Sequence, residues 1–187
     1  MTKKKEPVEI LVIADRSGSM FSIRSDAIGG FNTFLKEQQA VKGKANFTLV
    51  LFDDQYEVPV KGVDIKQVEE LTDKTFVPRG MTAMNDAIGK SLSELLDKSP
   101  EKAIICILTD GAENASKEYT SEQVKELIKE AEGKDYQVTF LAANVDAFAA
   151  GGSLGISMNN TFAFAASAQG IHEAYATMST RSTTYRN

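Results

Sequence analysis

Two apolar runs constrain the fold more than any other feature of this sequence. Residues 8–14 (Val-Glu-Ile-Leu-Val-Ile-Ala) contain one charged residue, and residues 102–109 consist of a lysine followed by Ala-Ile-Ile-Cys-Ile-Leu-Thr. Strands of this composition are typical of a parallel sheet that is covered by helices on both faces. The runs lead into Asp15 and Asp110, and the carboxyl ends of parallel strands are where such folds place their ligand sites.

Helical and strand patterns alternate along the rest of the chain. Apolar residues recur at helical spacing over 23–40 and from residue 83 until shortly before Pro100. The turn at 53–55 indicates that the strand after it pairs back antiparallel, and Pro59 in that strand suits a sheet edge. This alternation predicts a doubly wound α/β fold. The remaining expected helices are 65–71, 121–132, 146–151 and 168–180, and the remaining expected strands are 46–53, 56–63, 136–142 and 161–165.

Length and charge limit the domain organisation and the class of partner. A chain of 187 residues with 42% hydrophobic content can form one substantial core. We therefore expect a single domain over residues 8–183, with tails at 1–7 and 184–187. The net charge of −5 argues against a nucleic-acid phosphate binder, for which a basic face would be expected.

The sequence shows neither a targeting signal nor a membrane span. Four of the first seven residues are charged, and the apolar run that follows is too short for the core of a signal peptide. No segment approaches the roughly 20 apolar residues of a membrane helix. The single cysteine, Cys106, lies inside an apolar run and is expected to be a core residue rather than a nucleophile. These features favour a cytoplasmic protein without membrane contact.

Three short stretches, far apart in the chain, combine carboxylates with hydroxyls. They are Asp-Arg-Ser-Gly-Ser at 15–19, Gly-Met-Thr at 80–82 and Thr-Asp-Gly at 109–111. Each stands where a strand turns into a loop or a loop turns into a helix, so one end of one sheet can collect all of them. Carboxylate, hydroxyl and water oxygens are the ligands that hard divalent cations take. The sequence therefore predicts a metal site.

This pattern resembles the metal-ion-dependent adhesion site (MIDAS) of von Willebrand factor A (vWA) domains. The matching residues are Asp15, Ser17 and Ser19, then Thr82 in a middle loop, then Asp110. The resemblance covers nearly the whole chain, and the sequences around Asp15 and Asp110 are similar to those of intracellular bacterial and phage members. It implies a mostly parallel, Rossmann-like six-stranded sheet in the order 3-2-1-4-5-6, with strand three antiparallel and helices on both faces.

The resemblance also implies a ligand set and a function. Ser17, Ser19 and Thr82 would contact Mg²⁺, with Mn²⁺ or Ca²⁺ as other candidates, while Asp15 and Asp110 act directly or through water. Three neutral hydroxyls leave the cation electrophilic, with one position open to an Asp or Glu side chain of a partner protein. The implied function is a metal-dependent protein-interaction module.

Polar residues in neighbouring loops are candidates for a partner-binding rim around this site. Loops that leave parallel strands share one end of the sheet, although polar loops are equally typical of solvated turns. Arg79 is placed to meet an acidic group of a partner. The rim candidates are Asp53, Asp54, Arg79, Glu113, Asn114, Asn144 and Asp146.

Plainer interpretations stay open at this point. Ser-Gly-Ser is often only a loop, Asp-Gly after a strand is often a turn, and Thr82 has the position of a helix N-cap. The C-terminal helix could shift, as in relatives with regulated affinity, or could be static. A third interpretation is a structural or assembly protein, such as a phage component, in which the metal only holds loops together.

An enzymatic alternative is a Mg²⁺-dependent phosphotransfer or hydrolase domain. Receiver-like domains need an acidic pair early in the chain and a lysine near the later aspartate. Here a single Asp15 is followed by Arg and Ser, and the first lysine after Asp110 is Lys117. The one histidine, His172, falls in the last expected helix. Because a nucleophile with its base is not recognisable, we expect a protein that is not an enzyme.

Overall fold

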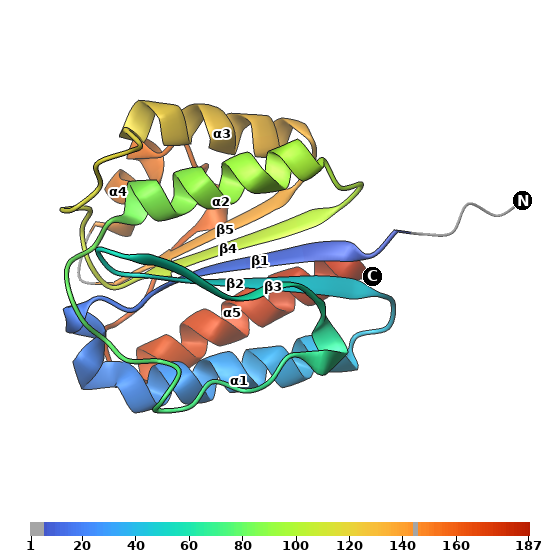
Figure 1. Ribbon diagram of the computed structural model, residues 1–187, viewed down its shortest axis with the longest axis horizontal. Helices are drawn as coiled ribbons and strands as arrows, with labels where there is room; N and C mark the ends of the chain where they lie inside the picture. The colour runs from blue at the N-terminus through green and yellow to red at the C-terminus, as the bar shows by residue number, and fades with distance from the viewer. Residues whose placement is uncertain (1–5, 144–145) are drawn as a thin grey trace, which may run out of the picture.

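A computed structural model describes residues 6–143 and 146–187, and its centre is one mixed six-stranded sheet (Figure 1). The strand order is β3-β2-β1-β4-β5-β6. β3 pairs antiparallel with β2, and the other neighbours are parallel. This confirms the predicted fold class and strand order. The strands are β1 (Val8–Asp15), β2 (Ala45–Phe52), β3 (Tyr56–Asp64), β4 (Ala103–Thr109), β5 (Gln137–Ala142) and β6 (Thr161–Ala163).

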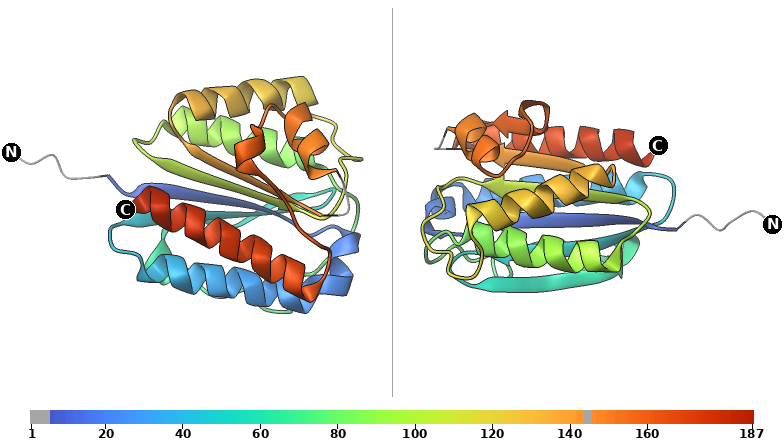
Figure 2. Two further views of the ribbon diagram at one scale, coloured as in Figure 1. Left: turned by 180° about the vertical axis from the view of Figure 1, so that it is seen from behind. Right: turned by 90° about the horizontal axis from the view of Figure 1, so that it is seen from above.

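Helices cover both faces of the sheet. α1 (Arg24–Ala40) and α5 (Ala168–Arg186) lie on one face, whereas α2 (Met84–Lys98), α3 (Ser121–Gly133) and the short α4 (Ala147–Ser153) lie on the other (Figures 1 and 2). The central strand β1 is buried along its whole length. Alternate residues of β1 point to opposite faces of the sheet. Val12 packs in the core beside α1 and α5, whereas Ile13 packs in the core beside α2 and α3.

The described residues also form three 3₁₀ turns, and one of them, η2, corrects a sequence prediction. They are η1 (Gly18–Ile23), η2 (Ile65–Gln67) and η3 (Met158–Asn160). The segment 65–71 was expected to be helical, but only its first three residues form a turn. The Asn32 side chain bonds both the N–H and the carbonyl of Leu71 (2.8 and 2.9 Å). Tertiary hydrogen bonds from α1 thus replace the helical ones.

The last helix is longer than the sequence suggested. α5 continues through Arg186, so the residues expected as a polar tail are helical almost to the chain end. The Arg186 guanidinium is buried and donates to the Gln38 carbonyl of α1 (2.6 Å) and to its side chain (3.2 Å). Gly30 lets Tyr175 approach α1, because a Cβ there would lie 2.5 Å from the tyrosine ring. The two helices therefore lie along each other (Figure 2).

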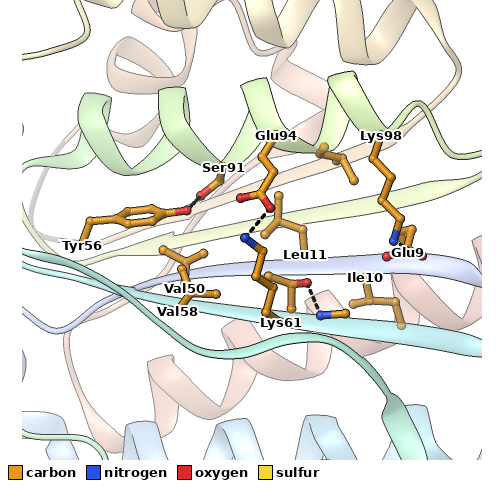
Figure 3. Close-up of a pocket in the computed structure, with 13 residues that line it drawn as sticks. Glu9, Ile10, Leu11, Val50, Tyr56, Val58, Lys61, Ser91, Glu94 and Lys98 are labelled. Carbon is orange, nitrogen blue, oxygen red and sulfur yellow. Dashed lines mark hydrogen bonds and ion pairs between the residues drawn. The ribbon is translucent and has the colours of Figure 1, made fainter.

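A cavity of about 160 Å³ separates part of α2 from the β2–β3 edge of the sheet (Figure 3). Its walls include Leu11 and Val50. Lys61 pairs with Glu94 (2.5 Å) at its mouth, while Lys98 pairs with Glu9 at another end. The cavity is thus an apolar space bounded by paired charges.

The single cysteine, Cys106, is fully buried in β4. This burial raises the pKa of its thiol to about 12 and confirms the expected core role.

Among the described residues, no helix combines the length and apolar content that crossing a membrane requires.

Candidate metal centre

The loops that carry the five predicted ligands meet at one end of the sheet, the end where β1, β2 and β4 finish (left in Figure 1). β1 and β4 are parallel neighbours with Ala14 opposite Leu108. Asp15 and Asp110 therefore leave adjacent strands side by side. The two apolar runs predicted that each aspartate ends a strand, and the strand order that the resemblance implies predicted that these strands are neighbours.

Hydrogen bonds connect the carboxylates to the hydroxyls. The Ser19 hydroxyl donates to Asp110 Oδ1 (2.6 Å) and lies 3.1 Å from the Ser17 hydroxyl. Asp15 Oδ1 accepts from the Ser17 N–H (2.7 Å), and its Oδ2 accepts from the Thr109 hydroxyl (2.6 Å). Thr109 was not predicted as a site residue, and it orients Asp15 from the neighbouring strand.

Thr82 joins this cluster from the loop that precedes α2. A Cβ placed on Gly111 would lie 3.2 Å from the Thr82 hydroxyl and 3.8 Å from the Ser19 hydroxyl, so both hydroxyls stand beside the same glycine. The N-cap of α2 is Ala83, without a side-chain cap bond. The Thr82 side chain is thus not the helix cap that the plainer interpretation assigned to it. A hydroxyl that does not cap the helix is available to a ligand.

The electrostatics of the two carboxylates favour a bound cation. Asp15 and Asp110 are 0% and 2% exposed. Burial raises the pKa of both, and the charge of Asp15 raises that of Asp110 further. In the described parts of the chain, neither forms an ion pair with a lysine, arginine or histidine.

The donor set matches a hard divalent cation. Two carboxylates and three hydroxyls offer only oxygen, which is the ligand type of Mg²⁺ and its relatives. In the described residues, no group of three or more His, Cys, Asp and Glu side chains is arranged for a metal. A metal here would therefore depend on hydroxyl oxygens as well as on Asp15 and Asp110.

Structural comparisons place the fold among known domains. No protein-family model matches the sequence, and no curated protein matches it either. The vWF domain of the type V pili tip protein Mfa5 from Porphyromonas gingivalis superposes with a TM-score of 0.73 at 12% identity, over 99% of this chain and 98% of that one. The chain has the vWA fold.

Other vWA-like structures match over part of longer chains. Proximal thread matrix protein 1 from the mussel byssus, in a structure with a zinc-occupied MIDAS motif, gives a TM-score of 0.70 at 14% identity, over 96% of this chain and 46% of that one. The pilus adhesin SpaC from Lactobacillus rhamnosus GG gives 0.73 at 16% identity, over 97% and 30%. This chain thus spans about half the length of the mussel chains that it matches.

Several rim candidates form hydrogen bonds or ion pairs within the chain. Asp53 is fully buried and accepts from Arg16 (3.1 Å) and from Arg79 (3.0 Å). Glu113 accepts from the backbone N–H of Asn85, at the start of α2 (2.7 Å). Arg79, expected to meet a partner's acidic group, pairs here with acidic groups of its own chain.

The other rim candidates differ among themselves. The Asn114 side chain accepts from the Thr82 N–H (2.8 Å) and so supports a metal-site loop. Asp146 caps α4 by accepting from the Ala149 N–H (3.0 Å), and Asp54 is exposed. Asn144 lies outside the described residues.

Besides Thr109, sequence reasoning missed two residues beside the site, Arg16 and Glu57. Arg16 stands between two predicted ligands, but its side chain turns away from them and donates to Asp53 and to Glu57 (2.7 Å). The arginine and these acceptors are 37 and 41 residues apart in sequence, so no local pattern connects them. The position of Arg16 inside the motif was the one available signal.

Glu57 gives this region a pH dependence. Its hydrogen bond with Arg16, assisted by Arg79, lowers the pKa of the Glu57 carboxyl from 4.5 to about 2. A depressed pKa stabilises the fold above the unfolded-state value, and that stability is lost as the pH falls toward 2. We expect Glu57→Gln to have a lower free energy of unfolding than wild type at about pH 5, and we expect this difference to narrow by about pH 3.

Urea unfolding at both pH values measures the difference between the two proteins. A difference that stays constant would contradict the lowered pKa of Glu57. The effect should be modest, since the side chain is 47% exposed.

Proposed function

We propose that this chain is a metal-dependent protein-interaction domain. Asp15, Ser17, Ser19, Thr82 and Asp110 would hold a divalent cation, Mg²⁺ in the first instance, with Mn²⁺ or Ca²⁺ as substitutes. One observation carries the proposal. Two buried carboxylates, which have no basic partner among the described residues, stand next to the hydroxyls of Ser19 and Thr82 from two different loops.

The carboxylates and the hydroxyls would have different roles in binding the cation. Asp15 and Asp110 supply the negative charge that attracts the cation, and the hydroxyls add ligands without further charge. Thr109 fixes the orientation of Asp15 through its 2.6 Å hydrogen bond. The bound cation would supply a Lewis-acidic position that a carboxylate oxygen of another protein can occupy.

The structural neighbours support a role in protein interaction. They are a pili tip protein, a pilus adhesin and a byssus matrix protein, and all three share the vWA fold with this chain. These neighbours are pilus and byssus proteins and do not support the cytoplasmic location that the sequence favoured, and the bacterial or phage origin rests on the sequence resemblance.

The histidine supports the choice of a binding module over a hydrolase. His172 lies on α5 with its ring nitrogen 3.6 Å from Asp26 of α1, and among the described residues it makes no hydrogen bond with Asp15, Asp110 or the hydroxyls beside them. A Ser-His-Asp arrangement at Asp15 or Asp110 is therefore not formed, since this is the single histidine of the chain. Phosphatase or nucleotidase turnover that disappears in Asp15→Asn would reverse this conclusion.

Exposed apolar side chains on the same end of the domain indicate what flanks the partner's carboxylate. Phe21 follows Ser19 in η1, Met81 precedes Thr82, and Phe148 lies in α4. Their side chains are 69%, 55% and 48% exposed. Exposed large apolar residues near a polar centre are typical of interaction sites. We therefore propose a partner whose acidic residue has apolar neighbours.

A peptide selection tests the function. Displayed peptides with one fixed aspartate and random flanks are selected on the domain in Mg²⁺, and the enriched sequences are measured by calorimetry. We expect binding to require Mg²⁺ and to weaken at least about thirtyfold in Thr82→Val, which keeps the shape but removes the oxygen.

Thr33→Val is the matched control, because it removes an exposed hydroxyl from α1, whose one hydrogen bond is to the Gly29 carbonyl. Its peptide affinity should equal that of wild type. Binding that persists unchanged in EDTA and in Thr82→Val would mean that partners dock elsewhere and that any metal is structural.

A further inference from the structure

The segment 79–83, which carries Thr82, is tied to three neighbouring loops by its backbone. Gly80 allows this path, since its φ is +66° and a Cβ would lie 1.9 Å from the Asp54 carboxylate. The backbone bonds run from Arg79 N to Arg16 O (2.9 Å), from Gly18 N to Gly80 O (3.2 Å), from Ala83 N to Asp53 O (2.8 Å) and from Asn114 N to Thr82 O (3.0 Å).

A closed ring of charges supports the same segment. Asp53 Oδ2 accepts from the Nε atoms of both Arg16 (3.1 Å) and Arg79 (3.0 Å). Glu57 accepts from the same two guanidinium groups through its two oxygens, each at 2.7 Å. This charge ring (Arg16, Asp53, Glu57, Arg79) joins the end of β1, the β2–β3 turn and the start of segment 79–83.

The ring is not explained by stability alone. Arg16 and Asp53 are 4% and 0% exposed, and burying such charges costs free energy that an apolar pair would avoid. Nη2 of Arg16 is buried without a hydrogen-bond partner among the described residues, so part of the hydrogen-bonding capacity of the guanidinium is unused. The Arg79 side chain, by contrast, is 44% exposed, yet its Nη2 atom donates to Glu57 of the ring and to the side chain of Gln55.

We infer that the charge ring is a positioning device for the metal site, and this inference rests on the proposed function. Arg79 fixes the start of segment 79–83, so the Thr82 hydroxyl stands beside Gly111 and Ser19 before a cation arrives. Without Arg79, cation binding has to order the segment, and ordering backbone costs conformational entropy. Arg79 is therefore a positioning residue that acts through Thr82.

Arg79→Gln tests this with Mn²⁺ alone as the probe. We expect Mn²⁺ binding, followed by electron paramagnetic resonance, to weaken roughly fivefold or more, because part of the binding free energy goes into ordering the segment. The melting temperature without metal should change little, since a half-exposed arginine contributes weakly to stability. Arg79→Lys should be intermediate, because an ammonium lacks the fork that reaches two carboxylates at once.

Lys61→Gln is the matched control. It breaks the exposed ion pair between Lys61 of β3 and Glu94 of α2, and Lys61 has no hydrogen bond or ion pair with the ring residues among the described residues. Its Mn²⁺ affinity should equal that of wild type. A merely structural role of Arg79 would lower the melting temperature and leave the Mn²⁺ affinity unchanged.

Amide hydrogen exchange without metal gives an independent measurement. We expect faster exchange at Thr82 and Ala83 in Arg79→Gln, because their N–H bonds to Asn114 and Asp53 open more often. If wild type binds Mn²⁺ and Arg79→Gln binds it equally well, the inference is overturned and the metal site stands. If wild type binds no Mn²⁺, the proposed function fails, and unchanged exchange in Arg79→Gln then overturns the positioning role as well.

Discussion

The melting temperature of the domain should rise by roughly 5 to 11 °C when Mg²⁺ is present at about one hundred times its dissociation constant. A ligand that binds only the native state at this concentration stabilises by about 2.7 kcal/mol. The physical reason lies in Asp15 and Asp110, two buried carboxylates that repel each other and that a cation would neutralise. Calorimetric melting in Mg²⁺ and in EDTA measures the difference.

Asp110→Asn is the decisive variant for this measurement. The amide oxygen can still accept from the Ser19 hydroxyl, so the local hydrogen bond survives while the charge is lost. We expect a normal fold without metal and a strongly reduced Mg²⁺ shift. Identical melting of wild type in Mg²⁺ and EDTA would contradict the metal site itself.

Asp53→Asn should be among the most destabilising single changes in this domain. Removing one partner of a buried ion pair leaves an uncompensated charge, which commonly costs about 3 to 5 kcal/mol. Here two guanidinium groups share Asp53 Oδ2, and Arg16 is almost completely buried. The asparagine keeps the acceptor for the Gln55 N–H (2.6 Å), whereas its amide nitrogen replaces the oxygen that accepts from both guanidinium groups. Urea unfolding gives the free energy.

The adjacent residue provides the control for this variant. Asp54→Asn removes the same charge one position away, from an exposed side chain, and should change the free energy of unfolding by less than about 0.5 kcal/mol. Equal effects of the two substitutions would mean that the loss of net charge, and not the ring, determines stability.

Sequence reasoning identified most of the fold because the signals were local. The apolar run at 8–14 and the helical spacing in α2 depend on residues a few positions apart, and both elements form as predicted. The prediction failed at 65–71, where Asn32 binds the backbone of Leu71 from another element. A pattern within a short window contains no information about such a partner.

The sequence alone determined most of the elements that form, and it determined that Asp15 and Asp110 end two buried strands. The tertiary structure decided what surrounds them, because side-chain partners depend on which strands become neighbours in the sheet. Thr109 orients Asp15 from 94 residues away, and Arg16 leaves the site for Asp53, 37 residues away. Hydrogen bonds and ion pairs act over a few ångströms in space, whereas sequence periodicity describes only neighbours along the chain.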